Sequence, residues 1–177
     1  MTQATDKTEH RATTEVGGAE DFTKPLIRRK TLTARNAGSM RTVIDVGEAG
    51  QMVTDEPVAH GGTGEGPTPL QTVLGALCGC ESVTFNRTAA EMGLEYRGIT
   101  FEAEFRIDIR GRMGKADVRP HFQTVRVEAR VDTDASDEEL ARVVEETERR
   151  CPVFNLISDA NVKLQMRWLR GAAHAAA

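Results

Sequence analysis

The most regular apolar pattern in the chain lies within residues 61–93, where a glycine-rich loop leads into a run of apolar residues. These residues recur every three to four positions, as on one face of an α-helix. They are Val73, Leu74, Leu77, Cys80, Val83 and Thr84. Thr68 and Gln71 have the spacing of a capping box. Pro69 suits the first helical position and Gly93 suits the residue that ends a helix. We therefore predict a buried central helix between Pro69 and Gly93.

Two glycines lie inside this predicted helix. Gly75 and Gly79 each destabilise a helix by about 1 kcal/mol relative to alanine. Because they are four residues apart, they lie on the same side of the helix. The missing side chains would let another backbone approach closely there, so we expect a close contact on this side.

Beyond Gly93 the apolar positions change to a period of two. This period is typical of strands with one face toward the core and one toward water, as in an antiparallel sheet. Three such stretches are predicted as strands, at 99–109, 125–131 and 162–168.

A second helix is predicted between the last two of these strands. Ser136 and Glu139 have the spacing of a capping box. The apolar stripe that follows is Leu140, Val143, Val144 and Thr147, and one further step reaches Cys151. Since Pro152 cannot continue a helix interior, we expect a kink after Cys151 and a short turn over 153–157.

The segments that precede the central helix are less regular. Residues 1–20 are polar, and we predict a disordered tail there. We predict a first strand at Lys24–Thr33, and a β-hairpin formed by Met40–Val46 and Gln51–Thr54. The predicted organisation is therefore a tail at 1–20, one domain at 21–170 and a second tail at 171–177.

Composition narrows the class of protein. The 177 residues suffice for one domain, and 39% hydrophobic residues with a net charge of −4 are typical of a soluble protein. Only 5% of residues are aromatic and no Lys/Arg block occurs, which argues against nucleic-acid binding. No apolar run approaches the ~20 residues of a membrane span, and the first residues lack the apolar core of a signal peptide. Three cysteines in such a chain favour a reducing cytoplasm.

Cys80 lies mid-helix on the apolar stripe, and two interpretations are open. A free cysteine is commonly a small buried hydrophobic residue. A reactive thiol there would need a cation from elsewhere in the fold, because the field of a helix N-terminus fades within the first turn. Cys78 points about 200° away around the helix, so we expect it to serve packing.

Two motifs, one around each of two cysteines, carry a family resemblance. DEPVAHGGTGEGPTPLQTVLGALCGCESVT, at 55–84, combines a Gly-Pro-Thr-Pro loop with an apolar helix that contains Cys80. RRCPVFNLI, at 149–157, places Cys-Pro before an apolar turn. Together with the order of the predicted elements from Pro25 to Arg170, these motifs resemble the OsmC/Ohr family of thiol-dependent hydroperoxide reductases.

The resemblance implies an α+β, OsmC-like fold with antiparallel sheets packed around a long central helix, in an intertwined homodimer. It implies a cysteine-based peroxidase that reduces organic hydroperoxides, with hydrogen peroxide as a further candidate substrate. Cys80 would be the peroxidatic cysteine, and its sulfenic acid would condense with the resolving Cys151 to a disulfide. A dithiol reductant, either a dihydrolipoyl protein or a small thiol, would then restore the thiols. No flavin, haem or metal cofactor is implied.

Gln71 departs from the family pattern, since relatives carry a glutamate there that positions an arginine over the thiolate. A neutral amide can hydrogen-bond a guanidinium but adds no charge, and the capping box alone would explain this glutamine. Family placement favours Arg41 or Arg35 as the activating arginine. Arg87, on the same helix face as Cys80 but roughly 10 Å away, is a further candidate.

Two other functions are weighed against the peroxidase. A non-catalytic member of the same fold would bind an apolar small molecule in the dimer cleft. A zinc module built from the three cysteines ranks last, because neither the cysteines nor the four histidines have the spacing of metal ligands.

Overall fold

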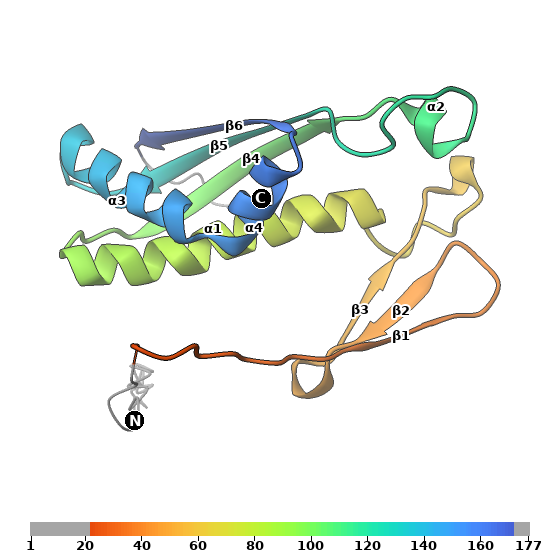
Figure 1. Ribbon diagram of the computed structural model, residues 1–177, viewed down its shortest axis with the longest axis horizontal. Helices are drawn as coiled ribbons and strands as arrows, with labels where there is room; N and C mark the ends of the chain where they lie inside the picture. The colour runs from red at the N-terminus through yellow and green to blue at the C-terminus, as the bar shows by residue number, and fades with distance from the viewer. Residues whose placement is uncertain (1–21, 172–177) are drawn as a thin grey trace, which may run out of the picture.

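The computed structural model describes residues 22–171, so the tails predicted at 1–20 and 171–177 lie outside the described residues, apart from Gly171. Within that range, two three-stranded sheets and a long helix organise the chain (Figure 1). The elements are β1 (Thr33–Asn36), β2 (Thr42–Asp45), the 3₁₀ helix η1 (Gly47–Ala49), β3 (Gln51–Thr54), the 3₁₀ helix η2 (Val58–His60), α1 (Pro69–Met92), β4 (Gly98–Arg106), α2 (Ile109–Arg112), β5 (Thr124–Asp132), α3 (Asp137–Arg150), α4 (Pro152–Asp159) and β6 (Lys163–Arg170).

The first sheet, β1–β2–β3, is antiparallel and projects from the rest of the molecule near the N-terminal end of α1 (Figure 1). The predicted hairpin of β2 and β3 is confirmed. The strand predicted at Lys24–Thr33 is wrong, because β1 begins only at Thr33. The Nδ2 group of Asn36 donates to the carbonyls of Ser39 (2.7 Å) and Arg41 (2.9 Å). This side chain closes the turn directly after β1, so strand pairing starts beside it.

The predicted central helix is confirmed as α1, including its ends. The hydroxyl of Thr68 accepts a hydrogen bond from the backbone N–H of Gln71 at 3.3 Å, and Oε1 of Gln71 accepts one from the N–H of Thr68 at 2.9 Å. Pro69 occupies the first turn, and Gly93 ends the helix with a left-handed φ of +73°. Local chemistry therefore defines both ends of this helix.

The buried face of α1 differs from the predicted one. Its buried side chains are Leu74, Leu77, Glu81, Phe85, Thr88 and Ala89. Val73 and Val83, both predicted as buried, are 41% and 55% exposed. Helices α3 and α4 and strand β4 contact α1, and the opposite side is open, because a Cβ atom added to Gly75 or Gly79 would meet no atom within 4 Å. The helix is thus apolar on two sides, of which this chain covers one.

The second sheet, β4–β5–β6, is mixed. Strands β4 and β5 are antiparallel, whereas β6 runs parallel to β5, because α3 and α4 form a crossover between them. The predicted first strand of this sheet ends early, at Arg106. Asp108 instead caps α2 by accepting a hydrogen bond from the N–H of Arg110 at 3.0 Å, and Ile109 is exposed.

The core lies between the second sheet and α1, with α3 and α4 beside the helix (Figure 1). Its buried apolar residues form two clusters. The first is Leu74, Leu77, Phe122, Val125, Val127 and Ile157, and the second is Phe85, Ala89, Val131, Leu140 and Val143. This core packs α1 against α3 and α4, which meet at Cys151.

Candidate active site

Cys151 lies at the junction of two helices. It ends α3, and its Sγ accepts a hydrogen bond from the backbone N–H of Phe154 at 3.4 Å, which caps the start of α4. Pro152 produces the expected break, but the turn predicted at 153–157 is a full helix, α4. Proline suits the first helical turn, so it both ends α3 and starts α4. The sulfur is thereby fixed at a buried position, with no exposed surface.

Cys80 lies in the middle of α1 and is partly exposed, at the edge of the buried face. Its thiol is close enough to Cys151 to raise the pKa of the Cys151 thiol. The structure therefore brings together the two cysteines that are 71 residues apart in sequence, one accessible and one buried. Such a pair suits a reaction in which an accessible thiol is oxidised and a protected thiol then attacks it.

Cys78 lies on another side of α1, as its position in the helix predicts. It packs against the core cluster that contains Leu74 and Leu77. Burial raises the pKa of the Cys78 thiol, and the charge of Glu81 raises it further. Cys78 is therefore expected to be a poor nucleophile at neutral pH.

Glu81 is a member of this site that the sequence interpretation missed. Its side chain is fully buried, and neither carboxylate oxygen has a hydrogen-bond partner among residues 22–171. Burial raises the pKa of this carboxyl to about 7; interaction with the Cys151 thiol lowers it, and the charge of Glu148 raises it. The thiol and the carboxyl thus face each other closely enough to interact, without the geometry of a full hydrogen bond. A glutamate four residues after Leu77 and four before Phe85, on the buried stripe, was the available signal.

Burial is also the main reason that the pKa of the Cys151 thiol lies well above its usual range. The facing carboxyl of Glu81 raises it further, and the hydrogen bond from Phe154 opposes this shift. Cys151 at rest is therefore a protonated thiol that needs help to lose its proton.

The arginine candidates lie away from the two cysteines. Arg35 is exposed on β1, and Arg41 follows the β1–β2 turn, where its Nε donates to Oε2 of Glu65 at 2.6 Å. Arg87 is exposed on α1. Within the part of the chain that the structure describes, no hydrogen bond or ion pair joins any of the three to Cys80.

Gln71 faces the loop and not the cysteines. Its Oε1 accepts from both the N–H and the hydroxyl of Thr68, at 2.9 and 3.0 Å. Cys80 lies nine positions further along the helix, or about 14 Å away. Glu65 and Gln71 both line a hollow of about 710 Å³, together with Met52, Val53, Gly66, Pro67, Thr72, Gly75 and Ala76.

A buried aspartate shapes the loop that carries Glu65. Asp55 accepts hydrogen bonds from the N–H of Glu56 (2.8 Å) and of Glu65 (3.3 Å), and from both the N–H (2.9 Å) and the hydroxyl (2.6 Å) of Thr63. These bonds, chiefly the one from the Thr63 hydroxyl, lower the pKa of Asp55 to about 2. At Gly62 a Cβ would lie 1.8 Å from the carbonyl oxygen of Glu56, so the loop requires glycine there.

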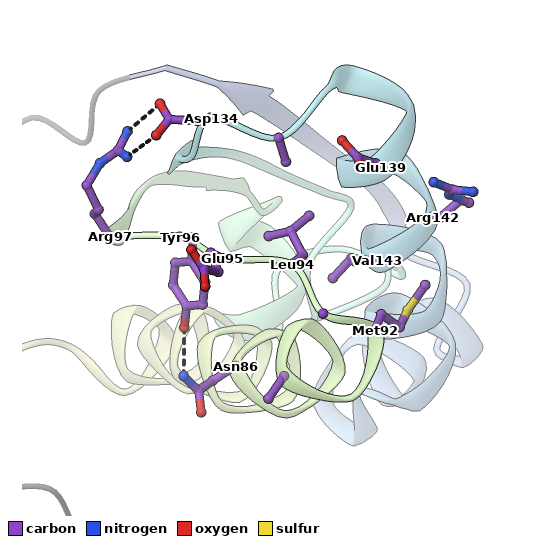
Figure 2. A pocket seen from close by; sticks show the side chains of 13 residues that line it. Asn86, Met92, Leu94, Glu95, Tyr96, Arg97, Asp134, Glu139, Arg142 and Val143 are labelled. Carbon is purple, nitrogen blue, oxygen red and sulfur yellow. Dashed lines mark hydrogen bonds and ion pairs between the residues drawn. The ribbon is translucent and has the colours of Figure 1, made fainter.

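A second hollow, of about 970 Å³, lies between the C-terminal end of α1 and the start of α3. Figure 2 shows Arg97 pointing toward Asp134, and Tyr96 toward Asn86, with Leu94 and Val143 lining the hollow between them. The guanidinium of Arg97 is neutralised by Asp132 and Asp134. None of the cysteines lines this hollow, so it is separate from the thiol site.

Among residues 22–171, no helix combines the length and the hydropathy that crossing a membrane requires. In the same range, no group of three or more His, Cys, Asp and Glu side chains is arranged to hold a metal ion.

Known proteins share this architecture. An OsmC-like protein from Mycoplasma pneumoniae superposes with a TM-score of 0.71 at 16% identity, over 82% of this chain and 99% of its own. The organic hydroperoxide resistance protein OsmC from Legionella pneumophila gives 0.62 at 17% identity, over 82% and 99%. An organic hydroperoxide resistance protein from Elizabethkingia anophelis, with thiocyanate bound, gives 0.62 at 15% identity, over 82% and 98%. These similarities show a shared fold.

No curated protein sequence matches the chain. The family model described as OsmC-like protein matches residues 62–167, which is more than half of the chain and includes both Cys80 and Cys151. The chain therefore belongs to the OsmC-like protein family.

Proposed function

We propose that this protein is a thiol-dependent peroxidase that reduces organic hydroperoxides, with Cys80 as the peroxidatic and Cys151 as the resolving cysteine. The observation that carries the proposal is the contact between a partly exposed cysteine on α1 and a buried cysteine at the α3–α4 junction. The names of the similar proteins from Legionella pneumophila and Elizabethkingia anophelis support the substrate class.

The proposed reaction has two steps within the protein. The Cys80 thiolate attacks the terminal peroxide oxygen, the O–O bond breaks, and the alkoxide leaves as an alcohol after taking up a proton. Cys80 is then a sulfenic acid. The Cys151 sulfur attacks it, the S–O bond breaks, and water leaves as the disulfide forms. A dithiol, either a dihydrolipoyl protein or a small thiol, reduces the disulfide, and the cytoplasm is the proposed setting because it supplies such reductants.

We further propose that the activating arginine comes from a second copy of the chain. The exposed side of α1 contains Gly75 and Gly79, where a second backbone could approach closely. Two such helices crossing antiparallel there would bring the start of one helix, with its β1–β3 sheet, beside the middle of the other. Arg41 on that sheet, held by Glu65, would then reach Cys80 of the other copy. Arg35 is the alternative arginine, and Gln71 lies next to Glu65.

Peroxide reduction with a panel of thiols tests the proposal. Reduced protein is treated with one equivalent of cumene hydroperoxide and its cysteine-containing peptides are mapped. We expect a Cys80–Cys151 disulfide, catalytic turnover with a dithiol, loss of both in Cys80→Ser, and full activity in the matched control Cys78→Ser. A dominant Cys78–Cys151 disulfide, or the absence of turnover with every thiol, would reject the assignment.

A second candidate function is the binding of an apolar small molecule without catalysis. The hollow beside Gln71 favours it, since Met52, Val53, Pro67 and Ala76 give it an apolar wall on the exposed side of α1. Binding that is unchanged in Cys80→Ser, in a protein with no peroxidase turnover, would support this function.

A further inference from the structure

Glu81 is a buried acid with no assigned task in this chemistry. It follows Cys80 directly in α1, is fully buried, and has two carboxylate oxygens without a hydrogen-bond partner among the described residues. Burying an unpaired carboxylate costs free energy. A carboxyl at such a position is therefore expected to be protonated or to take part in the chemistry.

Only a few titratable groups act on Glu81. The thiol of Cys151 faces it from the α3–α4 junction, and Glu148 faces it from α3. Cys78 lies near it on the same helix. Glu148 is itself held by the indole N–H of Trp168, which donates to its Oε1 at 3.1 Å. In the described residues, α4 and β4 add no charged group that shifts the pKa of Glu81, and no cation pairs with it.

We propose that Glu81 is the proton acceptor for Cys151, and that it returns this proton to the leaving hydroxide when the disulfide forms. This inference rests on the proposed function. The Glu81 carboxylate removes the Cys151 proton, the Cys151 sulfur attacks the Cys80 sulfenic sulfur, and the S–O bond breaks. The hydroxide takes the proton from Glu81 and leaves as water, so the carboxylate is regenerated and no further reactant is consumed.

The proton-binding properties of the two groups suit this role. Burial keeps the Cys151 thiol protonated at neutral pH, so it needs a base to become a nucleophile. Burial also raises the pKa of Glu81 to about 7, which lets the same carboxyl take and return a proton near neutral pH. Both side chains are fully buried, and the carboxyl and the thiol interact with each other, so the transfer needs no solvent.

The decisive measurement separates disulfide formation from peroxide chemistry. In a Cys78→Ser background, Cys80 is converted to a mixed disulfide with thionitrobenzoate, and attack by Cys151 is followed by the release of the coloured thiolate. We expect Glu81→Gln to slow this release by about 100-fold, within the usual range for the loss of a general base. The matched control, Glu138→Gln in the exposed first turn of α3, should leave the rate unchanged. Release from Glu81→Gln at the parent rate would overturn the proposal.

The pH dependence provides a readout that a merely structural role would not move. The release rate in the Cys78→Ser parent should rise with pH through about 7, as Glu81 loses its proton. Replacing Glu148 by glutamine removes a nearby charge and should shift this inflection to lower pH. A parent profile without an inflection near neutral pH would overturn the proposal even if Glu81→Gln fails to fold.

Oxidation by peroxide distinguishes a failure of the peroxidase proposal from a failure of the Glu81 proposal. With cumene hydroperoxide, Glu81→Gln should form the Cys80 sulfenic acid at nearly the parent rate and accumulate it, as trapped by dimedone. If Cys80 of the parent is never oxidised by peroxide, the peroxidase proposal fails. Slow thionitrobenzoate release in Glu81→Gln would then still support Glu81 as the proton acceptor for Cys151.

Discussion

Arg41 and Glu65 form an ion pair between the β1–β2 turn and the loop that precedes α1, with 2.6 Å between Nε and Oε2. The family resemblance implies a glutamate at the position of Gln71 that holds an arginine, whereas Gln71 itself forms the helix cap with Thr68. Glu65 lies beside Gln71 in the same hollow, and we propose that it supplies this carboxylate from another part of the chain. On the basis of this ion pair we propose Arg41, in preference to Arg35, as the arginine that acts on the thiolate.

Replacing Glu65 by glutamine should lower the rate of peroxide reduction by about tenfold. The variant replaces an ion pair with a hydrogen bond from the guanidinium to a neutral amide, so Arg41 loses Coulombic attraction and would be less well positioned. The partners are 36% and 56% exposed, so the stability effect should be small, within about 1 kcal/mol. Stopped-flow oxidation of Cys80 measures the rate, with Glu48→Gln, an exposed glutamate in η1, as control. Equal rates for Glu65→Gln and the parent would remove Arg41 from the mechanism.

Asp55 should stabilise the folded protein at neutral pH and lose this effect in acid. Its pKa in the folded protein is about 2, below the ordinary value near 4, so the unfolded chain binds more protons between these values. The contribution of the carboxylate is therefore complete above about pH 4 and is lost as the pH falls toward 2. Asp55→Asn should lower Tm by several degrees at pH 7, and the gap to the parent should narrow below pH 4. Thermal unfolding across this range, with Asp117→Asn as an exposed control, checks the sign; a gap that widens in acid would contradict it.

The ends of the helices were predictable because they depend on neighbouring residues. Thr68 and Gln71 form the capping box that their spacing indicates, and Ser136 does the same for α3. The position of β1 was not predictable, because it depends on the turn that Asn36 closes and on pairing with β2. The parallel pairing of β6 depends likewise on the crossover through α3 and α4.

In the candidate site, too, features set by neighbouring residues were predictable and features set by contacts between distant elements were not. Cys80 and Cys151 were predicted as site residues from motifs that lie within short stretches of sequence. Glu81 was not predicted, because the apolar pattern places Val73 and Val83 on the buried face. Both valines are exposed, whereas the charged Glu81 is buried. Periodicity predicts that a helix has a buried face, and the contacts with α3 and α4 decide which face that is.

Gly79 offers a test of the proposed dimer. In the separate chain, a Cβ at this position meets no atom within 4 Å, so Gly79→Ala should stabilise the helix by about 1 kcal/mol. If a second α1 approaches there, Gly79→Leu should instead block association and shift the protein to monomers. Sedimentation measures the oligomeric state, and Ala141→Leu, on an exposed part of α3, is the matched control. A Gly79→Leu protein that associates like the parent would place the interface elsewhere.

Restoring the glutamate at position 71 should raise the rate of peroxide reduction severalfold. A carboxylate beside Glu65 would give Arg41 a second anionic partner, with a Coulombic attraction that the amide of Gln71 lacks. A nearby negative charge also disfavours a thiolate, but the carboxylate would contact the arginine and not the sulfur, so better placement of the arginine should dominate. Glutamate in the first turn also keeps the capping box with Thr68 and suits the helix dipole, so Tm should hold or rise slightly.

The double variant decides whether Glu65 and the residue at position 71 serve the same arginine. If both carboxylates act through Arg41, Gln71→Glu should recover most of the rate that Glu65→Gln loses, and the two effects should not add. In the Arg41→Lys background neither substitution should change the rate much, because lysine lacks the fork that two carboxylates can hold. Rates that multiply independently, in variants of equal Tm, would mean that Gln71 is a helix cap alone. Glu65 would then hold Arg41 without any contribution from the start of α1.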